Sequence, residues 1–327
     1  MEKTELWIRG HNLDQLENMQ SHGDVTHLMI GSPHEILSKE DLDLSITRFL
    51  PRLELLSVYE LGLTTVDLDP LVSCSSLKHL IIGSNTLESI DLAPLERVKT
   101  LESISIFGTK IQSIDLQPLS GCSELEEVAV RNTSISSIDL LPLKPCSKMK
   151  FLNFDLNRLR NIDLSVLCSF PLLDLLGLYS NRIEHLDLSS LASTRITFLR
   201  LSENQLTEID LSPLREVTYI GELILSQNHI SSLDLEPLSS CDVNELAMDN
   251  NEIEEIDLSP LEEHSGLEAV TLHKNPIREL DVTPLFSCKG LEILQVDRNL
   301  RLIAEPFDSA PPGLQRLLKR IVTKKRQ

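Results

Sequence analysis

Aspartate is the residue whose spacing along this chain could do chemistry. Eleven aspartates follow one another every 24 residues, with two gaps of 23, in contexts such as IDLSPL and LDLEPL: Asp43, Asp67, Asp91, Asp115, Asp139, Asp163, Asp187, Asp210, Asp234, Asp257 and Asp281. Aligned carboxylates could hold a row of calcium ions, or each could make one local hydrogen bond in a repeated unit. Calcium takes about six to eight oxygen ligands, whereas this motif offers one carboxylate per copy between apolar neighbours. The sequence therefore favours a structural aspartate and predicts no metal site.

Proline follows the aspartate by three positions in eight of the eleven copies. Proline suits the first turn of a helix, where its missing N–H would have no partner. The residue before the proline is then expected to be the N-cap, and Asp69, Ser212, Ser259 and Thr283 are suitable caps. We expect the aspartate to accept free backbone N–H groups at the entrance to this turn.

Five of the six cysteines share one position, seven residues after the aspartate: Cys74, Cys122, Cys146, Cys241 and Cys288. Other copies have Val98 or Thr194 there, so the position is expected to be small and mostly buried, with the thiol as apolar filler. The sequence has no CxxC pair, which argues against zinc. Free buried thiols fit a reducing cytosol, although disulfides between neighbouring copies remain open.

Catalytic motifs are missing from the sequence. It contains no phosphate-binding glycine loop, no HExxH and no nucleophile elbow. His27, His79 and His273 are expected on separate strands without a matching carboxylate or cysteine cluster. The sequence therefore predicts a protein that is not an enzyme and needs no cofactor.

A second pattern precedes each aspartate and predicts the elements that position it. One copy has Leu77, Leu80, Ile82, Asn85, Leu87 and Ile90, in the order L-x-x-L-x-L-x-x-N-x-L. Alternating apolar and variable residues indicate a short strand with one buried side. A fixed period of this length is typical of a solenoid. The asparagines are expected to form a ladder that satisfies backbone groups where each strand ends.

This pattern resembles the leucine-rich repeat family over residues 25–303. The resemblance implies an α/β solenoid, with a concave parallel sheet and short 3-10 or helical turns on the convex side. We expect one continuous domain: an N-terminal cap at 1–24, about twelve repeats at 25–303, and a C-terminal cap at 304–327. In that cap, PGLQRLLKRIV predicts a short basic amphipathic helix that lays Leu314, Leu317, Leu318 and Ile321 over the last coil.

The formal net charge of −20 argues against nucleic acid or an anionic membrane as the main partner. The sequence contains no apolar run of the roughly 20 residues that a membrane-spanning helix needs, and the first residues lack the layout of a secretory signal. We expect a cytoplasmic monomer that binds protein.

The exposed strand positions carry half of the twelve aromatic residues. Phe151, Leu175 and Phe198 are expected side by side on successive strands, and the sheet then becomes acidic toward Glu245. An apolar cluster with a polar rim is typical of protein-binding sites, although aromatic ladders can also merely stabilise a sheet. The predicted partner-binding residues are Phe107, Phe151, Asn153, Asp155, Leu175, Tyr179, Phe198, Arg200, Glu222 and Glu245.

Two functions fit this surface. The first is a non-enzymatic intracellular scaffold that binds a protein partner through the concave sheet. The alternative is a regulatory or inhibitory subunit of an enzyme, such as a phosphatase, that acts through the acidic part of the same surface.

Overall fold

A computed structural model of the chain describes residues 4–9, 24–31 and 42–324. The chain divides into two compact units, unit 1 (Met1–Leu173) and unit 2 (Asp174–Gln327), which are described separately. The predicted N-terminal cap falls largely outside the described residues.

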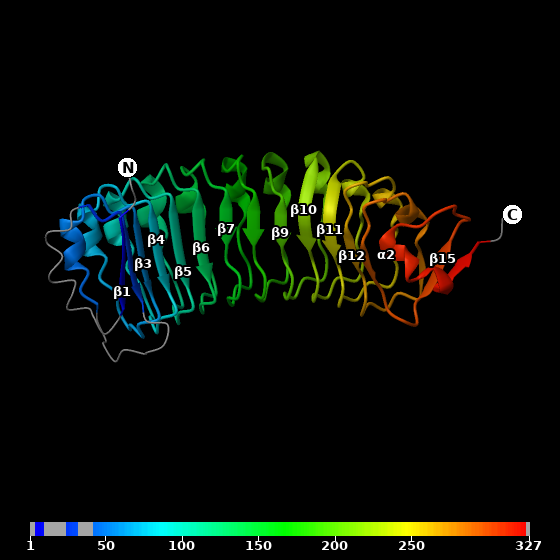
Figure 1. Cartoon of the computed structure of the whole chain (residues 1–327), viewed down its shortest axis with the longest axis horizontal. Helices are drawn as coiled ribbons and strands as arrows, with labels where there is room; N and C mark the ends of the chain where they lie inside the picture. The colour runs from blue at the N-terminus through cyan, green and yellow to red at the C-terminus, as the bar shows by residue number, and fades with distance from the viewer. Residues whose placement is uncertain (1–3, 10–23, 32–41, 325–327) are drawn as a thin grey trace. The chain divides into compact units, whose positions relative to one another are not determined.

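The strands of each unit are short and parallel, and each pairs with its equivalent in the next coil (Figure 1). In unit 1 they are β1 (Glu5–Arg9), β2 (His27–Gly31), β3 (Leu55–Tyr59), β4 (His79–Gly83), β5 (Ser103–Phe107), β6 (Glu127–Arg131) and β7 (Phe151–Asn153). In unit 2 they are β8 (Leu175–Gly177), β9 (Phe198–Arg200), β10 (Tyr219–Ile224), β11 (Asp242–Ala247), β12 (Ala269–Thr271) and β14 (Ile293–Gln295). We call the exposed surface of these strands the sheet face; it is the surface predicted to be concave.

Short 3-10 helices return the chain on the other side of each coil, which we call the turn side. In unit 1 they span Ser45–Phe49, Asp69–Ser73, Ala93–Arg97, Gln117–Gly121, Leu141–Leu143 and Ser165–Ser169. In unit 2 they span Ser189–Ser193, Ser212–Glu216, Glu236–Leu238, Ser259–Leu261, Thr283–Phe286 and Leu318–Arg320. The leucines and isoleucines of the repeat fill the space between strand and turn; Leu80, Ile82, Leu87 and Leu95 are all fully buried. Burying each such side chain contributes about 1.5–3 kcal/mol before entropy is counted.

The repeated aspartates are structural, as the sequence predicts. In all eleven copies one carboxylate oxygen accepts the backbone N–H two residues later, at 2.7–3.0 Å. The N–H of Ser212 and its hydroxyl lower the pKa of Asp210 in this way, because both hydrogen bonds favour the ionised carboxylate.

The predicted N-caps are wrong. Asp69 and Ser212 are the first helical residues rather than caps, proline comes second, and Leu68 and Leu211 stand at the cap. Leucine has no side-chain acceptor for the first turn. The aspartate one residue earlier supplies that acceptor, which explains why it is present in every copy whereas the residue before proline varies.

The asparagine ladder is also present. Asn228 donates to the carbonyl oxygens of Leu201 (3.1 Å) and Leu225 (2.9 Å) and accepts the N–H of Leu206 (3.1 Å), so it joins two coils. From Glu60 to Lys274, the residue before the ladder position lies in the left-handed region, as Glu203 and Gln227 do with φ of 54° and 58°. The hydrogen bonds of the asparagine compensate for this strained turn, which costs a non-glycine residue about 1–2 kcal/mol.

The five cysteines that share one position are buried, but they do more than fill space. The thiols of Cys74, Cys122 and Cys288 donate to backbone carbonyl oxygens of the preceding coil at 3.4, 3.5 and 3.1 Å. At the same position Nε2 of His264 lies 3.0 Å from the carbonyl oxygen of Leu238. Burial raises the pKa of Cys146 to about 11, which keeps the thiol protonated. All six cysteines are free, and Cys168 is exposed.

The C-terminal segment is not the continuous helix that the sequence predicts. Helix α2 covers only Pro312–Gln315, and strand β16 (Ile321–Thr323) then pairs with β15 (Arg301–Ala304), which pairs with β13 (Glu279–Asp281). The β-branched residues of β16 favour a strand, and β15 offers it an open edge. Leu314 is fully buried, whereas the other three predicted apolar contacts are only half-buried.

Candidate protein-binding surface

The first strands of unit 1 bring apolar residues together on the sheet face. The parallel register places Trp7 beside Met29, and Ile81 belongs to the same row two strands further on. Trp7 is 61% exposed, whereas Met29 and Ile81 are half-buried. Met29 and Ile81 are not among the predicted binding residues, although both occupy the variable centre of a predicted strand.

Two aromatic rings of unit 1 cover glycines of the neighbouring strand. A Cβ on Gly31 would lie 2.8 Å from the ring of Tyr59, and a Cβ on Gly83 would clash with the ring of Phe107. The guanidinium of Arg131 lies 5.9 Å from the centroid of Phe107. These contacts give Phe107 a role inside the sheet, since an aromatic ring shields the exposed backbone of a strand glycine. Its role toward a partner stays a prediction.

Phe151, Asn153 and Asp155 lie at the end of unit 1. The ring of Phe151 is 37% exposed. Oδ1 of Asn153 accepts the N–H of Asp155 at 3.0 Å, so this side chain stabilises its own turn. Among these three predicted residues, Phe151 offers the apolar surface.

In unit 2 the predicted residues form a row across four strands. The register pairs Leu175 with Phe198, Phe198 with Glu222, and Glu222 with Glu245. Neighbouring strands are about 4.8 Å apart, so these side chains are in reach of one another. The row is apolar at Leu175 and Phe198 and acidic at Glu222 and Glu245. The predicted contact of Phe151 with Leu175 involves both units and stays a prediction.

Arg200 connects the two halves of this row. Its Nε donates to Oε2 of Glu222 at 2.7 Å, and its guanidinium carbon lies 5.8 Å from the centroid of the Phe198 ring. Gly221 leaves room for this ring, because a Cβ there would lie 3.2 Å from Cε1 of Phe198. The aromatic, the cation and the acid are thus held in place before any partner arrives.

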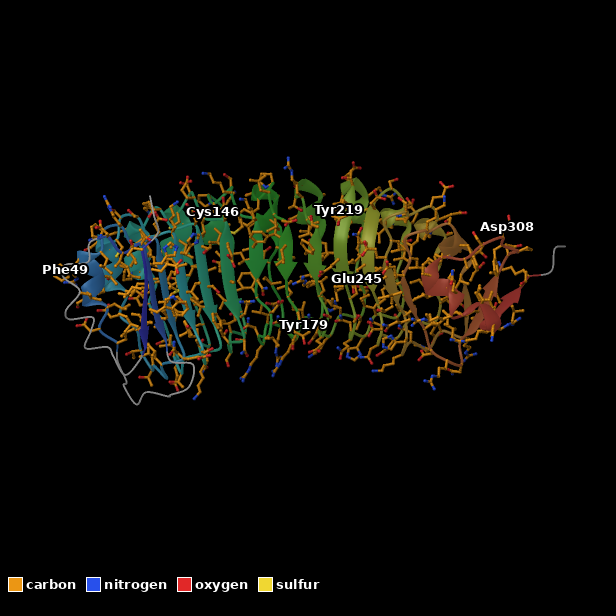
Figure 2. The ribbon with its side chains drawn as sticks, viewed as in Figure 1. Phe49, Cys146, Tyr179, Tyr219, Glu245 and Asp308 are labelled. Carbon is orange, nitrogen blue, oxygen red and sulfur yellow. The ribbon has the colours of Figure 1, made fainter. Side chains whose placement is uncertain are left out.

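Glu245 differs from Glu222 in having no ion pair among the described residues. Burial raises its pKa, and the carboxylates of Glu222 and Glu268 raise it further, while Arg200 acts in the opposite direction. Figure 2 labels Glu245 on the strands of unit 2. The sheet face therefore holds a partly buried acid beside a second acid of the same sign.

Two further acids of this face, Glu203 and Asp249, are hydrogen-bonded. Tyr179 donates to Oε1 of Glu203 at 3.1 Å, and Gln227 donates to the same oxygen at 3.2 Å. Asp249 accepts from the hydroxyls of Ser226 and Thr271, both at 2.7 Å. The predicted residue Tyr179, four positions after Leu175 in the sequence, is thus hydrogen-bonded to a polar group outside the row.

A Ser–His–Glu cluster lies on the sheet face of unit 1, although the sequence predicted none. Nδ1 of His79 lies 3.0 Å from Oγ of Ser103, and its Nε2 lies 4.0 Å from Oε2 of Glu102, which also pairs with Lys78 at 3.1 Å. Acyl transfer also needs N–H donors for an oxyanion. The neighbouring strands β4 and β5 use their amides in the parallel ladder. The ladder of these two strands therefore offers the cluster no free backbone N–H for an oxyanion.

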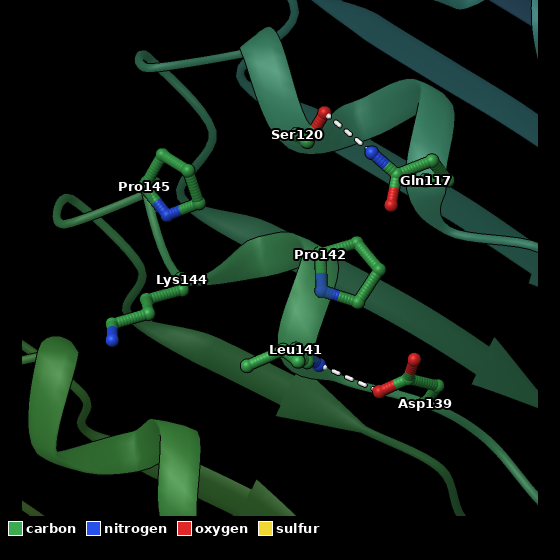
Figure 3. A pocket seen from close by; sticks show the side chains of 7 residues that line it. All are labelled: Gln117, Ser120, Asp139, Leu141, Pro142, Lys144 and Pro145. Carbon is green, nitrogen blue, oxygen red and sulfur yellow. Dashed lines mark hydrogen bonds between the residues drawn. The ribbon is translucent and has the colours of Figure 1, made fainter.

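The turn side of unit 1 has a shallow groove of about 530 Å³ (Figure 3). Leu141, Pro142 and Pro145 line it, with Asp139 and Lys144 at opposite ends. Its 3-10 helix is shorter than that of the preceding coil, and Pro145 lacks the N–H that a longer helix would use. Leu141 is 63% exposed in a position where most copies have small or polar residues.

Two further findings limit the chemistry of the described residues. Within them, no three His, Cys, Asp or Glu side chains converge as a metal site would require. No helix in the same part of the chain is long and apolar enough to span a bilayer.

Comparison with known proteins agrees with this geometry. Residues 62–174 match the BspA-type leucine-rich repeat region in six copies. An internalin, InlF of Listeria monocytogenes, has a similar structure, with a TM-score of 0.67 and 23% identity over 85% of this chain and 75% of its own. The chain has the leucine-rich repeat fold.

Other solved leucine-rich repeat proteins share this fold. One from Leptospira interrogans has a TM-score of 0.68 and 17% identity over 99% of this chain and 90% of its own. The plant peptide hormone receptor RGFR1, solved in complex with RGF2, has a TM-score of 0.67 and 15% identity over 98% of this chain and 53% of its own. No curated protein matches the sequence.

On this fold the sequence-predicted residues fall into two groups. Leu175, Phe198, Arg200, Glu222 and Glu245 lie together in unit 2, in direct pairing or contact. The other five predicted residues lie outside this group: Phe107, Phe151, Asn153, Asp155 and Tyr179. The first group is the candidate site, which we call the Phe198–Glu245 surface.

Proposed function

We propose that this protein is a non-enzymatic, intracellular scaffold that binds a protein partner through its sheet face. The observation that carries the proposal is the Phe198–Glu245 surface. It places half-buried apolar side chains next to an arginine and two carboxylates on adjacent strands. Aromatic and arginine side chains are the residues that most often dominate protein interfaces.

The fold supports a polypeptide ligand. Parallel strands present a fixed array of side chains whose identities can vary without disturbing the coil, since the buried positions and the ladders hold it together. RGFR1, which has this fold, was solved with RGF2 bound. The net charge of −20 further favours a protein over a nucleic acid.

The thiols support an intracellular location. Five cysteines are buried and free, and the raised pKa of Cys146 and of Cys241 reflects burial in each case. Exposed Cys168 is free as well. Free thiols persist best in a reducing compartment.

The proposal is tested by capture of a partner from cell lysate, identified by mass spectrometry. The variant Phe151→Ser/Phe198→Ser is expected to lose the partner, because both rings belong to the sheet face. The melting temperature should change little, since both rings are partly exposed.

Leu141→Ser is the matched control, since it removes an exposed apolar side chain from the turn side of unit 1. It should capture the partner as the unchanged protein does. Equal capture by the double variant and the unchanged protein would remove the proposal.

A second function is favoured by the acids of the same surface. A regulatory or inhibitory subunit could use Glu222 and Glu245 to occupy a basic site of an enzyme. If the captured partner is an enzyme, a loss of its turnover on adding this protein would distinguish inhibition from scaffolding.

A further inference from the structure

The negative charge of unit 2 is concentrated in the segment between residues 201 and 297. Residues 201–297 contain 21 acidic and 4 basic residues, which leaves a formal charge of −17 in this segment out of −20 for the whole chain. A surface of one sign attracts oppositely charged segments and speeds their association. This part of the molecule is therefore matched to a positively charged ligand.

The sheet face of unit 2 shows where that charge lacks compensation. Glu222 and Glu245 are paired across adjacent parallel strands, and like charges in such a pair destabilise a sheet. Arg200 forms an ion pair with Glu222. Glu245 forms none within residues 42–324, and Glu268 adds a third carboxylate near it.

Apolar side chains adjoin Glu222. Phe198 is its neighbour on strand β9, and half-buried Ile224 follows it by two residues on its own strand, β10. Lysine and arginine have long aliphatic stems that cover apolar surface while the charged end reaches an acid. A ligand with basic and apolar side chains fits this arrangement better than a purely polar one.

Two basic residues near the C-terminus, Arg320 and Lys324, are engaged within the last coil. Nη2 of Arg320 donates to the carbonyl oxygens of Asp297 (2.6 Å) and Leu300 (3.2 Å). Nζ of Lys324 donates to Asp281 at 2.5 Å and lies 3.6 Å from Glu305. These two cations stabilise the last coil, and neither of them pairs with Glu245.

We propose that the sheet face of unit 2 binds a basic, partly apolar polypeptide segment of the partner. An apolar side chain of that segment lies against Leu175 and Phe198, and a lysine or arginine enters between Glu222 and Glu245. The inference rests on the proposed function, because it names the kind of segment that the same face binds.

The test uses a defined probe, a fluorescein-labelled synthetic peptide of twelve residues in which lysine and leucine alternate. A second peptide replaces every lysine with glutamate. Fluorescence anisotropy measures the affinity of the full chain for each peptide at low and at physiological salt. The unchanged protein should bind only the lysine peptide, and salt should weaken this binding.

The decisive variant is Glu222→Gln/Glu245→Gln, which removes both charges while keeping the side-chain shape. Its affinity for the lysine peptide should fall by about tenfold or more. The reason is that losing a direct ion pair with the peptide weakens binding more than lowering the net charge of the protein does. The matched control Glu254→Gln/Glu255→Gln removes the same charge from two exposed residues between β11 and the next 3-10 helix. It should weaken binding by less than about threefold. Circular dichroism and melting curves verify that both variants fold.

Equal losses in the two double variants would overturn the inference, because only the overall field would then matter. So would absence of measurable binding, or a loss below about threefold in the decisive variant. If the phenylalanine double variant loses the captured partner but the glutamine double variant retains it, the inference fails and the proposed function stands. If both variants retain the partner, the proposed function fails.

Discussion

The acidic residues of the turn side and those of the sheet face differ in their interaction partners. On the turn side, each repeated aspartate accepts the backbone N–H of a residue two positions later, within its own coil. On the sheet face of unit 2, Glu245 lies beside Glu222 and has no ion pair in the described part of the chain. One acid completes a local turn, whereas the other carries an unfavourable interaction.

This difference distinguishes structural residues from candidate ligand-binding residues in a repeat protein. A residue that recurs in every coil and is satisfied inside that coil contributes to folding. A residue that occurs in a few coils, on exposed strand positions and without a partner, is available to a ligand. Substitutions of residues that recur in every coil are therefore expected to alter stability and leave ligand binding unchanged.

The largest loss of stability is expected from the asparagine ladder. Asn228→Ala should lower the free energy of unfolding by about 3 kcal/mol, because it leaves buried carbonyl and N–H groups of two coils without partners. Urea unfolding followed by circular dichroism measures the change. The control is Gln205→Ala, which changes an exposed residue of the preceding coil and should cost less than about 0.5 kcal/mol. Equal costs would mean that the ladder does not join the coils.

A smaller effect, here an increase in stability, is expected where threonine replaces asparagine in the ladder. Thr109 replaces asparagine, and its buried hydroxyl has no hydrogen-bond partner among the described residues. Thr109→Asn should raise the free energy of unfolding by about 1 kcal/mol, since an amide can both donate and accept at this position. A destabilised variant would show that the site has adapted to threonine.

The smallest effect is expected at a single turn-side aspartate. The N–H and hydroxyl of Ser212 hold the pKa of Asp210 below its ordinary value. Because the folded pKa is depressed, the stabilisation is fully present above the unfolded pKa of about 3.9 and is lost as the pH falls through the folded value. Asp210→Asn should therefore melt at a lower temperature than the unchanged protein at pH 7, and the difference should shrink at pH 2–3. Melting curves at the two pH values measure this; a difference that grows in acid would contradict it.

Much of the fold could be predicted because every coil repeats the same physical requirements. The spacing of Leu80, Ile82 and Asn85 predicts a strand, a buried side and a ladder, and the structure contains all three. The register that pairs Leu175 with Phe198 follows from the same period.

The remaining features depend on contacts that the period does not encode. The strand β16 forms because β15 leaves an edge open, which outweighs the helical pattern of the C-terminal residues. The left-handed residues before the ladder positions include glutamate, serine and leucine as well as Gly108, so composition gives only a weak signal for them. The period places His79 beside Ser103, but the approach of Nδ1 to Oγ at 3.0 Å depends on side-chain orientations that the period does not specify.

The division between the two sides is tested most directly by measuring unfolding and peptide binding on the same samples of two variants. Asn228→Ala, assayed well below its melting temperature, should lose stability and retain the affinity for the lysine peptide. Glu222→Gln/Glu245→Gln should retain stability and lose that affinity. If the glutamine variant unfolds more easily yet binds the peptide as before, the sheet-face acids are structural and the account is wrong.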